Sequence, residues 1–105
     1  MKVVILASLD QEKEIKRYKD IFIDTGWEVV VPAKQKDNVD KVSIILDYFN
    51  IISYADLAFV IKKPDGSLDK GVTYEMVYAK RCGVPIMYNT TFTSMLERYM
   101  HLKED

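Results

Sequence analysis

Two acidic residues and a glycine lie close together in the second half of the chain, in the segment Asp69-Lys70-Gly71-Val72-Thr73-Tyr74-Glu75. Asp69 directly precedes a predicted helix, where the positive end of the helix dipole favours an anion. Gly71 has no side chain, so a ligand can approach the backbone closely. Glu75 falls about one turn into that helix, and we expect it to share a cleft with Asp69. Two carboxylates in one cleft suit chemistry at a sugar carbon, where positive charge develops in an oxocarbenium-like transition state.

The same spacing also has a purely structural interpretation. Asp69 could cap the helix and Glu75 could be a solvated helix residue, because loops and helix starts are rich in these residue types. An Asp-x-Gly-x-x-x-Glu pattern therefore needs support from its surroundings before it indicates catalysis.

Flanking residues give the pattern more specificity. Ala55-Asp56 opens a β-rich run, Tyr78-Ala79 follows Glu75, and Gly83-Val84-Pro85-Ile86 leads into a further predicted strand. With Asp69-Lys70-Gly71, these segments resemble the signature of the nucleoside 2-deoxyribosyltransferase superfamily, which includes N-glycosidases of nucleotide 5'-monophosphates. The motif spans residues 55–85, and the resemblance in topology extends over most of the chain.

This resemblance implies cleavage or exchange of the N-glycosidic bond of a nucleoside or nucleotide, through a covalent glycosyl-glutamate. Glu75 resembles the family nucleophile, and Asp69 resembles the residue that hydrogen-bonds the sugar hydroxyls. Ser8 resembles the edge that meets the sugar or its 5' substituent, although a serine there is equally a helix cap. No metal or other cofactor is implied.

Two positions depart from the family pattern. The family usually has a tyrosine in the first strand, whereas Val3 to Ala7 contains none. The family often has an aspartate in the second helix at the position of Tyr48, and here Asp47 is its neighbour, rotated by about 100° round the helix. We take Asp47 as a candidate substrate-binding residue, and Tyr74 as one that packs or touches a base. A non-catalytic nucleotide- or nucleoside-binding module is the alternative function.

The elements that must position these residues follow from hydrophobic patterning. Continuous apolar, β-rich runs at residues 3–7 and 57–61 are typical of strands buried on both faces of a parallel sheet, and residues 27–31 and 85–88 are predicted as two further strands. Amphipathic helices are predicted between them, with an apolar stripe of Val42, Leu46 and Phe49 in the second. The alternation predicts a flavodoxin-like, doubly wound α/β fold with strand order 2-1-3-4. Ligands of such folds bind at the carboxyl ends of the strands.

Composition limits the classes of function. The 105 residues predict one domain, residues 1–105. Fifteen Lys and Arg against 16 Asp and Glu give a net charge of −1, so we expect no nucleic-acid polymer as partner. The first apolar run is too short for a signal peptide or a membrane span, which predicts a cytoplasmic protein. Cys82, the single cysteine, is expected to be a small buried hydrophobe.

A response-regulator receiver is the natural competitor for this topology. Such a domain needs an aspartate at the tip of its third strand, but here that strand ends in Ile61-Lys62-Lys63. We therefore reject that interpretation.

A homodimer, or a larger homo-oligomer, is the predicted assembly. Short loops at the rim cannot close over a sugar, and a reactive glycosyl intermediate requires that water be limited. The predicted contact elements are the second helix and the segment from Thr90 to Tyr99, which includes most of a terminal helix predicted over residues 91–102. They carry apolar residues outside the core stripes: Ile44, Ile51, Phe92 and Met95. The resemblance also implies shared sites between subunits.

Overall fold

The computed structural model describes residues 1–32 and 41–91, with the side chains of residues 41–45 excepted. Strands and helices alternate along these ranges: β1 (Lys2–Leu6), α1 (Glu12–Asp24), β2 (Glu28–Val30), α2 (Lys41–Ser53), β3 (Leu57–Val60), α3 (Lys70–Arg81) and β4 (Ile86–Tyr88). Most of the predicted terminal helix, including Phe92 and Met95, lies outside the described residues.

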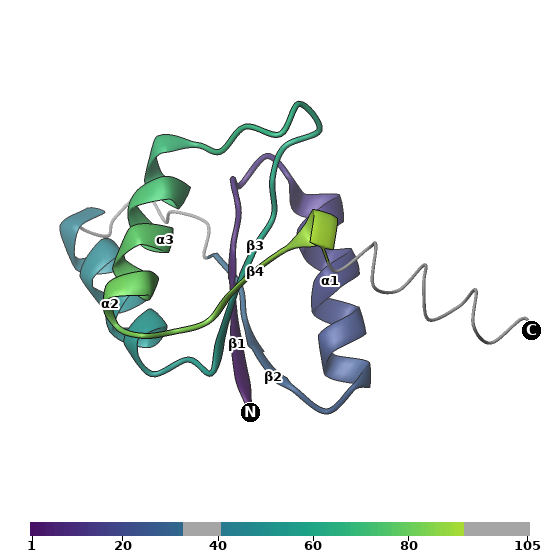
Figure 1. Ribbon diagram of the computed structural model, residues 1–105, viewed down its shortest axis with the longest axis horizontal. Coiled ribbons are helices and arrows are strands. Elements are labelled where there is room, and N and C mark those ends of the chain that lie inside the picture. The colour runs from purple at the N-terminus through teal and green to yellow at the C-terminus, as the bar shows by residue number, and fades with distance from the viewer. Residues whose placement is uncertain (33–40, 92–105) are drawn as a thin grey trace, which may run out of the picture.

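The four strands form one parallel sheet in the order β2-β1-β3-β4, as the sequence predicts. Val3 of β1 aligns with Val29 of β2 and with Leu57 of β3. Helix α1 covers one face of the sheet, and α2 and α3 lie side by side on the other (Figure 1). This is an α/β sheet of the flavodoxin-like kind, and all four strands end at the same rim.

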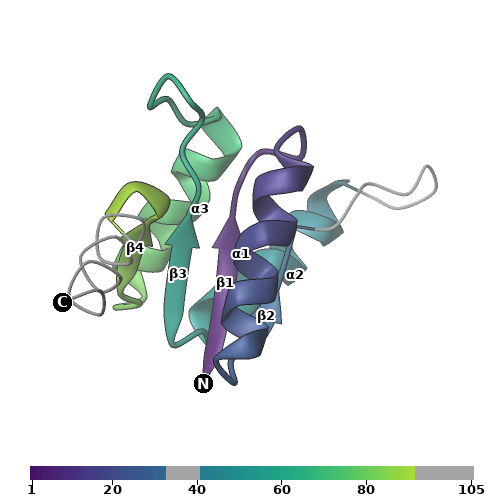
Figure 2. The same cartoon turned by 90° about the vertical axis from the view of Figure 1, so that its right-hand side faces the viewer.

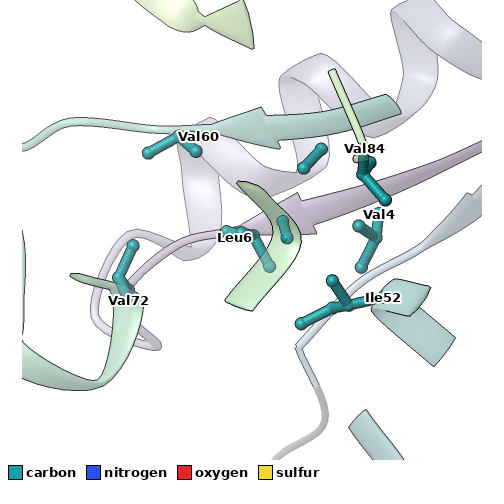
Figure 3. Packing of buried hydrophobic residues seen from close by; sticks show 8 residues of the cluster. Val4, Leu6, Ile52, Val60, Val72 and Val84 are labelled. Atoms are coloured by element: carbon teal, nitrogen blue, oxygen red, sulfur yellow. The ribbon is translucent and has the colours of Figure 1, made fainter. Parts of the chain in front are cut away.

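The sheet separates two hydrophobic clusters, because successive residues of a strand point to opposite faces. Val3 and Ile5 of β1 pack towards α1 with Tyr18, Phe22 and Phe59. Val4 and Leu6 of the same strand pack on the other face, under α2 and α3. Figure 3 shows this second cluster around the end of β1, with labelled side chains Val4, Leu6, Ile52, Val60, Val72 and Val84.

Three local expectations are wrong. Helix α1 begins after Gln11, so Ser8 does not cap it, and the Ser8 hydroxyl is left for another partner. Leu46 was expected in the core stripe of α2 but is 61% exposed, because α2 turns its Tyr48, Phe49 and Ile52 towards the sheet instead. Cys82 is exposed rather than buried, because α3 ends at Arg81 and leaves it in the turn before β4.

In the described ranges, 1–32 and 41–91, no helix combines the length and the apolar composition that crossing a bilayer would need.

Candidate active site

Asp69 lies at the rim of the sheet, and its carboxylate is held by two side chains from other loops. Lys63 Nζ, after β3, contacts Asp69 Oδ1 at 2.6 Å. The Ser8 hydroxyl, after β1, also donates a hydrogen bond to Asp69. The hydrogen bond from Lys63, which is the larger cause, and the one from Ser8 hold the pKa of the Asp69 carboxyl group below its usual value. Asp69 precedes α3 in an extended conformation but makes no side-chain capping hydrogen bond, so its carboxylate faces the rim instead.

The loop that carries Lys63 and Asp69 is tied to its neighbours. The Lys62 amide donates to Asn89 Oδ1 at 3.0 Å, and the Lys62 carbonyl accepts from Gln11 Nε2 at 3.2 Å. Figure 2 shows the β1–α1 and β3–α3 connections rising at the same end of the sheet. The two loops that supply Ser8, Lys63 and Asp69 are therefore neighbours at the rim.

Glu75 occupies a different environment from Asp69. It lies on α3 six residues after Asp69, about 9 Å further along the helix axis. Burial raises the pKa of its carboxyl group from 4.5 to about 7. A carboxylate in that range can change protonation state near neutral pH, which is a property shared by many catalytic carboxylates.

Replacing Glu75 with glutamine is expected to stabilise the protein at alkaline pH. The folded state retains the Glu75 proton between about pH 4.5 and 7 while the unfolded state releases it. Wild-type stability therefore falls as pH rises through this window, whereas glutamine stays neutral. At pH 8 the free energy of unfolding of Glu75→Gln should exceed that of wild type by about 1–2 kcal/mol after allowance for solvent screening.

Urea unfolding at pH 4.5 and pH 8 measures this difference, which should shrink at the lower pH. Glu28→Gln, at an exposed position on β2, is the matched control and should show no such gain. Equal or lower stability of Glu75→Gln at pH 8 would contradict the raised pKa.

Tyr48, rather than Asp47, is the residue of α2 that lies near Glu75. Burial raises the pKa of the Tyr48 hydroxyl, and the charge of Glu75 raises it further by a smaller amount. That hydroxyl donates a hydrogen bond of 2.5 Å to the Ile5 carbonyl of β1. Asp47, one residue before Tyr48 on α2, is exposed. The family pattern favours the acidic Asp47, whereas the face of α2 that packs on the core contains Tyr48.

The remaining predicted site residues lie on the first turns of α3. Gly71 is exposed, and a Cβ built there would meet nothing within 4 Å. No packing contact within the protein therefore requires a glycine at this position. The missing side chain leaves open space beside the rim of the sheet. Tyr74 is 59% exposed, with Lys70 Nζ at 5.9 Å from its ring centroid. The Tyr74 ring can therefore contact a ligand, but packing against the core does not fix its orientation.

One further feature of the described residues lies apart from this group. A groove of about 340 Å³ runs between α1 and the end of β2, where Leu9, Ile15 and Val31 contribute to its lining. It lies on the α1 face of the sheet, away from Glu75.

Within the described ranges, no group of three or more His, Cys, Asp or Glu residues is placed to hold a metal ion.

No protein-family model and no curated protein matches the chain. Among solved structures, the chain is similar to the CMP N-glycosidase BcmB of Clostridium botulinum, with a TM-score of 0.62. The alignment covers 84% of this chain and 70% of that chain at 21% identity. At this identity the likeness is one of fold alone.

Proposed function

We propose that this protein cleaves or exchanges the N-glycosidic bond of a nucleoside or nucleotide, with Glu75 as the nucleophile. The observation that carries the proposal is the half-buried Glu75 carboxyl group, whose pKa is raised to about 7, on the helix that directly follows an ionised Asp69. The fold shared with a CMP N-glycosidase supports the same chemistry.

The reaction is a double displacement. A Glu75 carboxylate oxygen attacks the anomeric carbon of the sugar, the carbon–nitrogen bond breaks, and the base leaves with a proton from an acid or from water. Water, or a second base, then attacks the same carbon. This step breaks the ester, releases the sugar or a new nucleoside, and restores the Glu75 carboxylate.

Asp69 would bind the sugar hydroxyls during both steps. Its carboxylate is ionised and already accepts hydrogen bonds from Ser8 and Lys63, which fix its orientation. Asp69 and Glu75 lie six residues apart, which is about 9 Å along the axis of α3. Gly71 lies between them in the sequence, and the open space beside it would let a ligand approach the backbone.

Incubation with nucleosides and nucleotides tests the proposal. Ribose and deoxyribose forms, with and without a 5'-phosphate, are incubated with the folded protein, and free base is followed by chromatography. A second free base added to the mixture separates exchange from hydrolysis. Absence of base release from every common substrate would contradict the proposed function.

A binding module without turnover is the second candidate, and one observation favours it. Lys63 and Asp69 form a direct ion pair, so the sugar-binding carboxylate is already occupied by a cation of the protein. Calorimetry separates the two candidates, because a ligand that binds and is recovered intact supports the binding module.

We also propose that the protein is a homodimer formed through α2 and α3. Leu46 on α2, Tyr74 and Val77 on α3, and Tyr54 just after α2 are between 41% and 75% exposed. The two helices lie side by side (Figure 1), and clustered apolar surface is typical of contact sites. A partner placed there would cover the rim near Tyr74 and limit water around Glu75.

Light scattering at micromolar concentration is expected to give the mass of a dimer. Leu46→Glu, at the exposed position of α2, should shift the protein to monomer, whereas Ile23→Glu, an exposed position of α1, should not. A monomeric wild-type protein with full activity would contradict the shared-site arrangement.

A further inference from the structure

The charges beside Asp69 bear on which substrate the proposed site accepts. In the proposed reaction, Asp69 binds the sugar hydroxyls, including the 3'-hydroxyl that ribose and deoxyribose share. The ring carbon that carries the 3'-hydroxyl is bonded to the ring carbon that carries the 5' substituent. A group at the 5' position therefore lies close to the side chain that holds the 3'-hydroxyl, and it interacts with the charges around Asp69.

Lys63 carries a positive charge next to Asp69, but that charge is already paired. Its Nζ contacts Asp69 Oδ1 at 2.6 Å. A tight turn also fixes the Lys63 backbone, since its amide donates to the Ser67 carbonyl at 3.0 Å and its carbonyl accepts from the Gly66 amide at 2.8 Å. The ammonium is therefore held beside a carboxylate of the protein, which balances its charge.

Lys62, the preceding residue, directs its ammonium to another element. Its Nζ lies 4.4 Å from the centroid of the Tyr88 ring of β4. Its amide donates to Asn89 Oδ1 at 3.0 Å and its carbonyl accepts from Gln11 Nε2 at 3.2 Å, so the backbone is held on both sides. This cation is therefore committed to an aromatic ring rather than to the surroundings of Asp69.

Asp65 adds a negative charge in the turn that Lys63 closes. Its Oδ1 accepts hydrogen bonds from the Ser67 hydroxyl at 2.6 Å and from the Ser67 amide at 2.9 Å. These bonds hold the pKa of the Asp65 carboxyl group below its usual value, so the group is ionised at neutral pH. Its charge lies two residues from Lys63 and acts on that ammonium as well.

Asp10 brings another carboxylate from the β1–α1 loop. The Gln11 amide donates to the Ser8 carbonyl at 3.0 Å, which closes a turn that contains Asp10. Gln11 Nε2 also donates to the Lys62 carbonyl at 3.2 Å, so this turn lies against the start of the β3–α3 loop. Asp10 is exposed, and its charge acts on the Lys63 ammonium of that loop.

Helix α1 begins at the same rim, and a helix N-terminus ordinarily favours an anion such as a phosphate group. Here the first turn of α1 already contains two acidic residues, Glu12 and Glu14. Asp10 lies two residues before the helix and adds to them. The positive end of this helix dipole is therefore met by carboxylates of the protein itself.

The carboxylates of Asp10, Asp65 and Asp69 thus act on the single ammonium of Lys63 where the two loops meet. A phosphate monoester brings between about 1.5 and 2 further negative charges at neutral pH. These charges repel the carboxylates, and the phosphate would have to compete with Asp69 for Lys63. A 5'-hydroxyl carries no charge and can donate a hydrogen bond to a carboxylate oxygen.

We propose, on the basis of the proposed function, that the substrate is a nucleoside with a free 5'-hydroxyl rather than a nucleotide with a 5'-phosphate. The ion pair between Lys63 and Asp69 and the carboxylates beside it carry this inference. Asp10 is the member of this group best suited to a test, because Asp69 is placed at the sugar and Asp65 is hydrogen-bonded within its own turn.

Calorimetry with Glu75→Gln, which keeps the ligand intact, compares each common nucleoside and deoxynucleoside with its own 5'-monophosphate. The nucleoside is expected to bind at least about tenfold more tightly than the monophosphate. Raising the salt concentration from about 0.01 M to about 0.3 M screens the repulsion, so the monophosphate should gain affinity while the nucleoside changes little. Monophosphate affinity that falls with salt would indicate a site made of cations and would overturn the inference.

Asp10→Lys, added to Glu75→Gln, should reduce the preference for the nucleoside by about tenfold, through tighter binding of the monophosphate alone. Asp10→Asn should reduce it by about threefold and replaces the lysine variant if that variant does not fold. Asp24→Lys is the matched control, because it makes the same change in net charge at the exposed last residue of α1, about 20 Å along the helix. Equal gains in monophosphate affinity from Asp10→Lys and Asp24→Lys would contradict the inference.

The calorimetry requires no turnover, so this inference and the proposed function fail separately. A wild-type protein that releases no base, together with tighter binding of nucleosides than of monophosphates, would remove the proposed reaction and leave the substrate class intact. Base release by wild type, together with equal or tighter binding of a monophosphate, would remove the substrate class alone. Binding of neither kind of ligand would remove both.

Discussion

Glu75→Gln is expected to reduce the rate of base release by about a thousandfold or more, because a neutral amide cannot replace the carboxylate that attacks the anomeric carbon. Glutamine keeps nearly the same shape, so substrate binding should change little. In the wild-type protein, kcat/KM should rise with pH up to about 7 and then level off, since the attacking form is the ionised one and the pKa of Glu75 is about 7.

Initial rates across pH 5 to 9, followed by chromatography of the free base, measure both effects. Glu28→Gln, at an exposed position of β2, is the control and should retain wild-type rates. A Glu75→Gln variant with most of the activity would exclude the nucleophile role. A wild-type rate that falls above pH 7 would instead assign Glu75 as a proton donor.

The architecture could be predicted from sequence because its strands are buried on both faces. The runs at 3–7 and 57–61 are continuously apolar, which a half-exposed strand could not be. Alternation with helices then fixes parallel pairing and right-handed crossovers, and the strand order follows. The strand bounds differ by one or two residues, as at β2, where the ladder stops at Val30 before the proline.

Helix faces were less predictable than strand order. Leu46 and Phe49 belong to one stripe by spacing, yet Leu46 is exposed and Phe49 packs on Tyr78 of α3. Spacing defines which residues share a face, but the neighbouring helix decides which part of that face is covered. The same limit applied to Cys82, whose exposure depends on where α3 ends.

The places of the candidate site residues were predictable where the backbone alone positions them. Asp69 and Ser8 follow from their places at the ends of strands and before a helix, and the structure joins them by a hydrogen bond. Tyr48 could not be identified in this way, because its contact with the Ile5 carbonyl spans 43 residues of sequence. Pro32, just after β2, gave the available signal, because a proline has no N–H and leaves a carbonyl of the neighbouring strand to find another donor.

Asp69→Asn is expected to lower kcat/KM for base release by about 10- to 100-fold, the effect of losing one or two charge-assisted hydrogen bonds to sugar hydroxyls. The amide keeps the shape of the side chain but carries no charge, and it loosens the contact with Lys63. Stability should change little, because Asp69 makes no capping hydrogen bond through its side chain and its ion pair with Lys63 is solvent-exposed.

Steady-state rates with one substrate, together with thermal unfolding, separate these two effects of Asp69→Asn. Asp65→Asn is the matched control, because it removes an acidic charge from the same loop while its Oδ1 can still accept the Ser67 hydrogen bonds. That control should retain both activity and melting temperature. If Asp69→Asn has the kcat/KM of wild type, Asp69 serves only as the partner of Lys63 and Ser8 at the rim, and the sugar must be bound by other residues. If instead Asp69→Asn and Asp65→Asn lose activity equally, the cause is the net charge of the loop, since the two variants share that change alone.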